Sequence, residues 1–147
     1  MRSRSWPYRW STIVLLVVSA SGCASRTAPP RSPAPAGAAR VLEAREGLAS
    51  YYADRFDGQT TASGSVFDND SLVAAHPSYP FGSVVRVTNL QNQRSVDVRI
   101  VDRGPAPAIR ERGVIIDVSR AAAQRLDFIT AGRTRVRVEV LEWGGRN

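Results

Sequence analysis

The chain of 147 residues has one cysteine, one histidine and no lysine. With Cys23 alone it cannot form an internal disulfide or a cluster of metal-binding thiolates. One histidine and one cysteine also fall short of the ligand set that a zinc site uses, so we predict no metal and no cofactor. The chain is rich in arginine instead, which supplies all 20 basic residues against 13 acidic ones and a formal charge of +7.

The chain also lacks an apolar run long enough to cross a bilayer. Its most apolar stretch, residues 13–20 (I-V-L-L-V-V-S-A), is far shorter than the ~20 residues that a spanning helix needs. Arginines at positions 2, 4 and 9 precede it and small residues follow, which is the order of an export signal. Because Cys23 directly follows A-S-G, we interpret residues 1–22 as a lipoprotein signal peptide and Cys23 as the lipidated residue.

Removal of the signal and its three arginines would leave 17 arginines against 13 acids, a formal charge of +4. An exported protein of this charge meets the anionic polymers of the envelope rather than DNA, so we expect no nucleic-acid partner. Residues 23–46 are rich in proline and alanine, which predicts an extended tether that reaches roughly 70 Å at about 3.1 Å per residue. Residues 47–143 are then the folded domain, and 144–147 a short tail.

The folded domain has the pattern of short strands. Valine alternates with arginine or glutamate in residues 134–142, which predicts a strand with one wet and one dry face. One short helix is expected after Ser119, its N-cap, with Ala122 and Leu126 on the inner face. The other predicted strands are 47–53, 72–75, 83–89, 94–102 and 114–117, and the long loops are 54–70 and 104–113. Six short strands with long connections predict a small closed barrel without exposed sheet edges.

Asp102 is the first candidate for a chemical role. Residues 96–101 alternate like a half-buried strand, and the pattern stops at Asp102, before Arg103, Gly104 and Pro105. A carboxyl group at the point where a rigid strand opens into a loop is well placed for catalysis. An aspartate before a Gly-Pro turn also often bonds its own backbone, and from these residues alone both interpretations stand.

Three stretches of the domain, taken together and in order, form a specific sequence signature. They are G-L-A-S-Y-Y with T-A-S-G and F-D; A-A-H-P with P-F-G-S-V-V-R-V-T-N-L; and V-R-I-V-D-R-G-P with I-I-D-V-S-R-A-A-A. Together they resemble the rare lipoprotein A family, the septal-ring lytic transglycosylases. The resemblance implies a mainly β fold, a six-stranded double-psi β-barrel, which barwin-like proteins, expansins and family 45 endoglucanases share. Many members also carry a C-terminal repeat domain of the SPOR type, which is not expected in this chain.

The resemblance also implies which residues act. Asp102, in D-R-G-P, matches the proposed catalytic acid, and His76, in A-A-H, matches a residue that lines the same groove. Ser65 stands where the family has a glutamate, and a serine cannot act as a general acid. The predicted catalytic residues are therefore Asp102 and His76. The predicted substrate-binding residues are Tyr51, Thr61, Ser65 and Arg103.

Some of these side chains have a plainer interpretation. A histidine satisfied by one hydrogen bond in a turn is as common as one in a groove. The resemblance favours the groove, where His76 orients the sugar or bonds Asp102. Tyr51, Tyr52 and Phe56 are able to stack on sugar rings, although packing in the core is the commoner fate of aromatic residues.

Lytic transglycosylases cleave the bond from N-acetylmuramic acid to N-acetylglucosamine without water and leave a 1,6-anhydro product. One carboxyl group serves both steps, because it protonates the leaving oxygen and then accepts the proton of the attacking C6 hydroxyl. Asp102 must therefore be protonated part of the time; burial favours this, while a close Arg99 or Arg103 opposes it. We expect Arg103 to point away from Asp102. Asp117 either reaches the groove or caps the helix after Ser119, and we favour the cap.

The leading hypothesis is an endolytic lytic transglycosylase, lipid-anchored in the bacterial cell envelope, in the outer membrane and facing the periplasm. Its expected partners are the glycan strands of peptidoglycan and the membrane, with division-site proteins as further candidates. The alternative is a non-catalytic, expansin-like glycan-binding lipoprotein, which the serine at position 65 favours.

Overall fold

The computed structural model describes residues 40–145. The predicted signal peptide, Cys23 and the tether as far as residue 39 lie outside the described residues. None of the helices within residues 40–145 combines the length and the apolar character that crossing a membrane requires.

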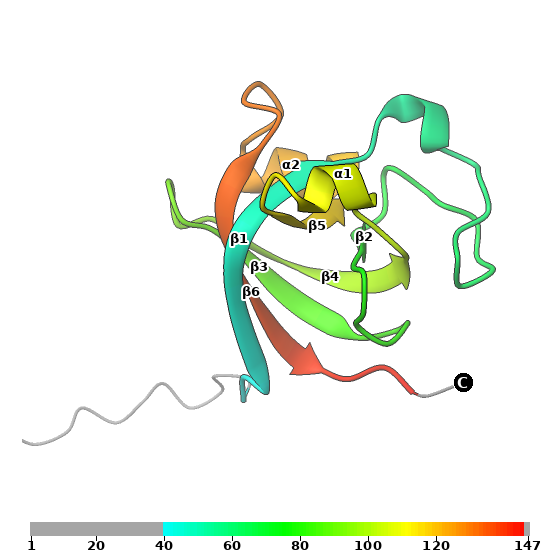
Figure 1. The fold of residues 1–147 in the computed structure, drawn as a ribbon, viewed down its shortest axis with the longest axis horizontal. Coiled ribbons are helices and arrows are strands. Elements are labelled where there is room, and N and C mark those ends of the chain that lie inside the picture. Colours follow the sequence, from blue (N-terminus) through cyan, green and yellow to red (C-terminus); the bar gives the residue numbers. More distant parts are fainter. Residues whose placement is uncertain (1–39, 146–147) are drawn as a thin grey trace, which may run out of the picture. The chain divides into compact units, whose positions relative to one another are not determined.

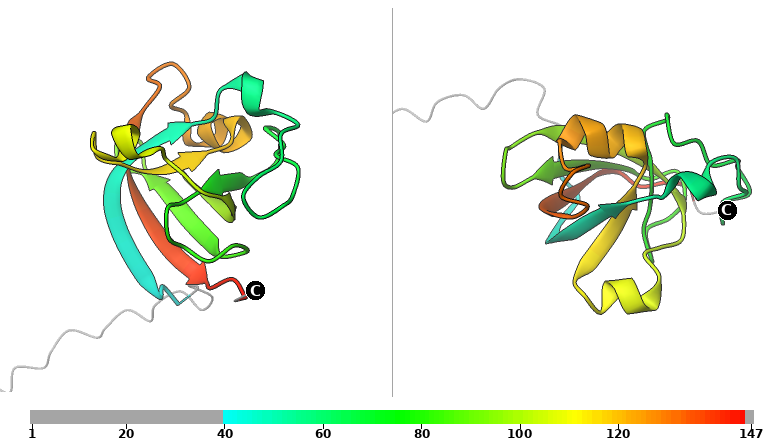
Figure 2. Two further views of the ribbon diagram at one scale, coloured as in Figure 1. Left: turned by 45° about the vertical axis from the view of Figure 1, so that its right-hand side comes forward. Right: turned by 90° about the horizontal axis from the view of Figure 1, so that it is seen from above.

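Six strands close into a barrel in the order β1-β5-β2-β4-β3-β6 (Figure 1, Figure 2). The pairs β1–β5 and β2–β4 are parallel, and the other four pairs are antiparallel. The strands are β1 Glu43–Tyr51, β2 Val73–Ala75, β3 Val84–Asn89, β4 Ser95–Asp102, β5 Val114–Val118 and β6 Thr134–Glu142. The closed six-stranded barrel expected from the sequence is confirmed.

Alternating valines fill the interior of the barrel. In β6, Val136, Val138 and Val140 are buried, while Arg135 and Arg137, which alternate with them, are exposed. β3 and β4 repeat the pattern, with buried Val85 and Val98 facing the same core. Because each strand turns one face inward, branched side chains pack in the interior and the barrel leaves no unpaired sheet edge.

Two α-helices pack on different sides of the barrel (Figure 2). The helix α2 Arg120–Leu126 begins as predicted, because the hydroxyl of Ser119 accepts a hydrogen bond from the backbone N–H of Ala122 at 3.3 Å. Leu126 on its inner face is fully buried. The prediction of a single helix was wrong, since residues 107–110 of the expected loop form α1 Pro107–Arg110. A helix of four residues is too short to show a periodic pattern, and its only sequence signal is proline in the first turn.

The strand β1 begins at Glu43 rather than at residue 47, so the last part of the predicted tether is strand. Residue Glu43 pairs with Val140 of β6, and Gly47 pairs with Val136. The residues 44–46 are exposed, which means that backbone hydrogen bonds and not apolar burial hold this half of the strand. The amino-acid composition of residues 43–46 therefore did not predict this part of the strand.

Two long connecting segments follow the ends of β1 and β4. The first, residues 52–72, contains the short 3₁₀ turn η1 Asp54–Phe56 and stands away from the strands in Figure 1. A bridge between Thr60 and Val66 folds it back on itself. The second, residues 103–113, contains α1 and joins β4 to β5.

Candidate active site

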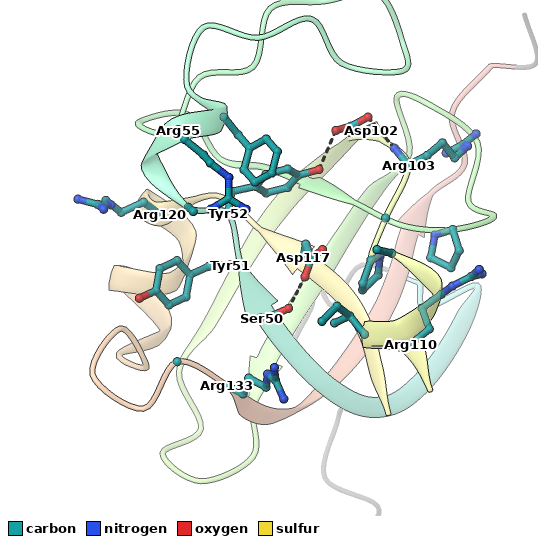
Figure 3. A pocket seen from close by; sticks show the side chains of 18 of the residues that line it. Ser50, Tyr51, Tyr52, Arg55, Asp102, Arg103, Arg110, Asp117, Arg120 and Arg133 are labelled. Carbon is teal, nitrogen blue, oxygen red and sulfur yellow. Dashed lines mark hydrogen bonds between the residues drawn. The ribbon is translucent and has the colours of Figure 1, made fainter. Parts of the chain in front are cut away.

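A cleft of about 1080 Å³ opens between the end of β1, the turn η1, the connection from β4 to α1, and β5 (Figure 3). Three aspartates line it. Asp54 is exposed and forms an ion pair with Arg120. Asp102 and Asp117 are partly buried and form no ion pair among the described residues. These two carboxyl groups are therefore the chemical candidates of the cleft.

The Asp102 carboxyl group is held by three donors. The hydroxyl of Tyr52 donates to its Oδ2 at 2.7 Å, and the backbone N–H groups of Ala62 and Arg103 donate to its Oδ1, each at 2.8 Å. The carboxyl group thus bonds the backbone of its own turn, as one interpretation of its sequence context predicted, and it also lines the cleft. Three fixed donors leave it little rotational freedom, which suits a group that must meet one substrate atom.

Tyr52 contributes to the site as a hydrogen-bond donor to Asp102, which the sequence did not predict. Its ring lies 4.3 Å from the ring of Phe67 and 5.6 Å from that of Phe56, centroid to centroid. Burial, together with the hydrogen bond to Asp102, raises the pKa of Tyr52, so the hydroxyl stays protonated and donates. For both Tyr51 and Tyr52 the sequence left open stacking on sugars or packing in the core. The only local signal that separates the two is strand alternation, which turns neighbouring residues to opposite faces.

Tyr51 lines the cleft but is committed to the packing around it. Its hydroxyl donates to the backbone oxygen of Ile129 at 3.2 Å, and its ring meets the edge of the Phe128 ring at 5.8 Å.

Asp117 corrects a prediction. It does not cap α2, because Ser119 does so, and its Oδ1 instead accepts a hydrogen bond from the hydroxyl of Ser50 on the neighbouring strand β1. Ser50 and Asp117 are register partners in the parallel pair of β1 and β5. Burial raises the pKa of Asp117, and the charge of Asp102 acts in the same direction, while the Ser50 hydroxyl and the charge of Arg133 lower it.

Strand pairing places the two carboxyl groups in one row of the barrel. Ala75 of β2 pairs with Asp102 on one side and with Asp117 on the other. Neighbouring strands lie about 4.8 Å apart, so the two backbones are separated by roughly 10 Å. Gly104 lies beside this row, since a β-carbon there would be 3.1 Å from that of Ala75, 3.4 Å from Oδ2 of Asp117 and 3.9 Å from the Tyr52 hydroxyl.

Arg103 lines the cleft, yet its guanidinium group points away from Asp102, as expected. Its Nη1 donates to the backbone oxygens of Tyr79 at 2.9 Å and His76 at 3.3 Å. The guanidinium carbon also lies 3.7 Å from the centroid of the Phe81 ring. Arg103 thus ties the loop after β4 to residues 76–81, and its charge does not pair with the carboxyl.

His76 is buried beside the site and does not line the cleft. Its ring stacks on Tyr79 at 3.5 Å, and its Nδ1 accepts from the backbone N–H groups of Tyr79 at 3.0 Å and Ser78 at 3.3 Å. Burial, helped by the charge of Arg45, lowers the pKa of His76 to about 4, so the ring is neutral. The expected side-chain bond to Asp102 is absent among the described residues; the backbone N–H of His76 donates to the Asp102 carbonyl oxygen at 3.2 Å instead.

Thr61 and Ser65 belong to a cluster of hydroxyl groups next to the cleft rather than to its lining. The Thr61 Oγ1 lies 2.9 Å from Oγ of both Ser63 and Ser65, and those two oxygens are 3.1 Å apart. The cluster shapes the turn that presents the Ala62 N–H to Asp102. Thr61 and Ser65 are therefore linked to the Asp102 carboxyl group only indirectly, through the backbone N–H of Ala62.

Arginines surround the mouth of the cleft (Figure 3). Arg110 and Arg133 are exposed there, Arg120 pairs with Asp54, and the guanidinium carbon of Arg55 lies 4.7 Å from the centroid of the Phe56 ring. Within residues 40–145 no three histidine, cysteine, aspartate or glutamate side chains gather as a metal site requires. The cleft thus combines a positive rim with Asp102 and Asp117, two carboxyl groups that form no ion pair among the described residues.

The chain is similar to known proteins along its folded part. A family model described as lytic transglycolase matches residues 44–138. The probable endolytic peptidoglycan transglycosylase RlpA of Treponema pallidum (strain Nichols) is 55% identical over 93 residues, which are 63% of this chain and 28% of that protein. The endolytic peptidoglycan transglycosylase RlpA of Pasteurella multocida (strain Pm70) is 48% identical over 99 residues, 67% of this chain and 32% of that protein.

The protein of the same name from Campylobacter jejuni (strain ATCC 700819 / NCTC 11168) is 41% identical over 107 residues, 73% of this chain and 38% of that protein. The chain thus spans about a third of the length of these relatives. Among solved structures, the Streptomyces papain inhibitor (SPI) matches with a TM-score of 0.55 and 23% identity over 69% of this chain and 97% of that one. At this identity the likeness concerns the fold alone, which is the expected double-psi β-barrel.

Proposed function

The chain belongs to the lytic transglycolase family, with rare lipoprotein A proteins as its relatives, and on this premise we propose that its barrel cleaves the glycan strands of peptidoglycan. The observation that carries the proposal is Asp102, a carboxyl group in the wall of an open cleft with three donors fixing its position. The positive rim of the cleft supports it further, because glycan strands of the wall carry acidic groups.

The proposed reaction breaks the bond between N-acetylmuramic acid and N-acetylglucosamine within a strand. Asp102 is the general acid/base: a carboxyl group protonates the leaving oxygen, and a carboxylate accepts the proton of the muramic C6 hydroxyl as that oxygen attacks the anomeric carbon. The products are a new sugar end and a 1,6-anhydromuramic end. Tyr52 and Ala62 hold Asp102 at the bond, and Arg103 fixes the loop behind it.

We further propose the roles that the sequence suggested for other residues. Tyr51 offers an aromatic wall to a sugar, while His76, Thr61, Ser65 and Arg103 shape the loops next to Asp102. The protein is proposed to work in the cell envelope, anchored to the outer membrane through a lipid on Cys23, with peptidoglycan as its partner and division-site proteins as further candidates.

A second function has one observation in its favour. Ser65, at the family's glutamate position, contributes a hydroxyl to a cluster with Thr61 and Ser63 and adds no third carboxyl group to the site. A barrel that binds glycan strands without cutting them would need no such group. This is the alternative of a non-catalytic, expansin-like glycan-binding lipoprotein.

The two functions are separated by product analysis. The purified protein is incubated with intact sacculi and with peptide-free glycan, and soluble fragments are examined by mass spectrometry for 1,6-anhydromuramic ends. Wild type should release them, and Asp102→Asn should lower the rate by about 100-fold or more. The matched control is Asp70→Asn, an exposed aspartate outside the cleft lining, which should keep full activity. Binding of wild type to insoluble peptidoglycan with no released fragment would favour the second function; equal blank traces from wild type and Asp102→Asn would end the first.

A further inference from the structure

Asp117 has features that a structural aspartate does not need. It is partly buried in the wall of the cleft that Asp102 also lines, on a different strand and from a part of the sequence 15 positions later. It forms no ion pair among the described residues and keeps its Oδ2 on the side of Gly104 and the cleft. Figure 3 shows its carboxyl group below that of Asp102, with Ser50 bound on the other side.

We propose that Asp117 is a second catalytic carboxyl group, which donates the proton to the departing sugar oxygen while Asp102 accepts the proton of the attacking hydroxyl. This inference rests on the proposed function. In this scheme two residues share the two proton transfers that a single acid/base would carry out in turn. Many enzymes that cleave glycosidic bonds use a pair of carboxyl groups in this way.

The geometry supports this division in two ways. Asp102 and Asp117 pair with the same residue, Ala75, so a sugar bridge across that row meets one carboxyl group on each side. Gly104 has no side chain at the place where a β-carbon would lie 3.4 Å from Oδ2 of Asp117, which leaves the space between the two groups to a substrate.

The surroundings of the two groups differ as an acid and a base require. Every hydrogen bond to the Asp102 side chain is donated to it, by Tyr52, Ala62 and Arg103. Asp117 receives one, from Ser50, and burial raises its pKa. A desolvated carboxyl group holds its proton longer and is the better donor, which suits Asp117 to the role of the acid.

Every proton that moves in this step is accounted for. As the bond from the anomeric carbon to the leaving oxygen breaks, that oxygen takes the proton of Asp117. The C6 oxygen bonds to the anomeric carbon and gives its proton to Asp102. One proton has then moved from Asp117 to Asp102, and water in the open cleft returns it before the next turnover.

The first test uses the leaving group. Peptide-free glycan has a sugar hydroxyl as leaving group and needs an acid, whereas a muramyl oligomer with a 2,4-dinitrophenyl aglycone does not. Asp117→Asn should lose about 100-fold or more on the glycan and stay within a few-fold of wild type on the aryl substrate. Asp102→Asn should be slow on both, and the control Asp70→Asn should match wild type on both.

Two results would overturn the assignment while leaving the proposed function intact. One is full activity of Asp117→Asn on the glycan, and the other is an equal loss on both substrates, which indicates a structural role for the Ser50–Asp117 pair. A wild-type protein that cleaves neither substrate would overturn the assignment together with the proposed function.

A second test uses the pH profile and does not depend on removing the carboxyl group. The charged and titratable groups that face Asp117 are Asp102 from β4, Arg133 from the segment before β6 and Tyr52 after β1. The Ser50 hydroxyl lowers the pKa of Asp117, so Ser50→Ala should raise it and move the alkaline limb of glycan cleavage to higher pH. Arg133→Gln should move the limb in the same direction. An alkaline limb that stays in place in both variants would contradict the role of Asp117 as the acid.

Discussion

At the scale of single residues, burial determines which side chains carry charge in the folded barrel. His76 has a pKa lowered from the ordinary 6.5 to about 4, so it is neutral in the fold and takes up a proton more readily after unfolding. Between these two values the unfolded chain binds more protons, and stability therefore falls as the pH drops from 6.5 toward 4. Above pH 6.5 the full stability is present.

This pH dependence should disappear in His76→Asn, whose amide oxygen is able to accept the backbone N–H groups that Nδ1 accepts now. From pH 7 to pH 4.5 wild type should lose on the order of 2 kcal/mol more than the variant, because over most of this range the unfolded chain takes up a proton at His76 and the folded barrel does not. Urea unfolding at both pH values measures the difference. Parallel losses in the two proteins would show that His76 does not titrate on unfolding.

The same scale shows what could be predicted about the site from the sequence. Asp102 was found because its signal is local, a strand that stops at a Gly-Pro turn. The bond from Tyr52 to Asp102 was not predicted, and the cap was favoured over the groove for Asp117, because the partners are distant: 50 residues separate Tyr52 from Asp102, and 67 separate Ser50 from Asp117. Only the closure of the barrel brings these pairs together, and no local pattern encodes its register.

At the scale of elements, the connection from β4 to α1 is the part that both carboxyl groups depend on. Gly104 packs so closely against Ala75 and Asp117 that a β-carbon would be 3.1 Å from the first and 3.4 Å from the second. Gly104→Ala should push the loop outward and misplace Asp102 against Asp117. Activity on peptide-free glycan should fall by about 10- to 100-fold, since a shift near 1 Å at a reacting group has effects of that size.

The matched control is Gly145→Ala, because a β-carbon there would meet no atom within 4 Å. Thermal unfolding should show a change of about 1 kcal/mol or less in either variant, so the loss of activity would not reflect unfolding. Gly104→Ala with full activity would mean that the loop tolerates the shift and that the spacing of the carboxyl groups is not set there.

Elements with strong alternation were predictable, and those without it were not. The expected strand 134–142 matches β6 because valine on every second residue follows the pleat of a strand. The first half of β1 and the helix α1 were missed, since one is held by backbone pairing with β6 and the other spans four residues. Elements stabilised by their neighbours leave little trace in their own sequence.

At the scale of the whole molecule, the proposed substrate is an insoluble polymer, and the proposed anchor would determine which part of it the cleft meets. The proposed catalytic groups all lie within residues 40–145, whereas Cys23 lies before them. Anchoring and chemistry should therefore be separable. The predicted tether is shortened by strand β1, which begins at Glu43, to about 19 residues. If extended, it would span up to roughly 60 Å and would let an anchored barrel reach strands well away from the bilayer.

Cys23→Ser tests this separation. In a bacterial host, wild type should be found in the membrane fraction and incorporate labelled palmitate, and Cys23→Ser should do neither, because serine offers no thiol for acylation. The purified variant should cleave soluble peptide-free glycan at the wild-type rate, since the cleft is unchanged. Ser21→Ala, a small residue that keeps the cysteine, is the control and should stay in the membrane fraction. If Cys23→Ser remains membrane-bound, a different segment anchors the protein; if it is soluble but inactive on soluble glycan, the anchor and the barrel do not act independently.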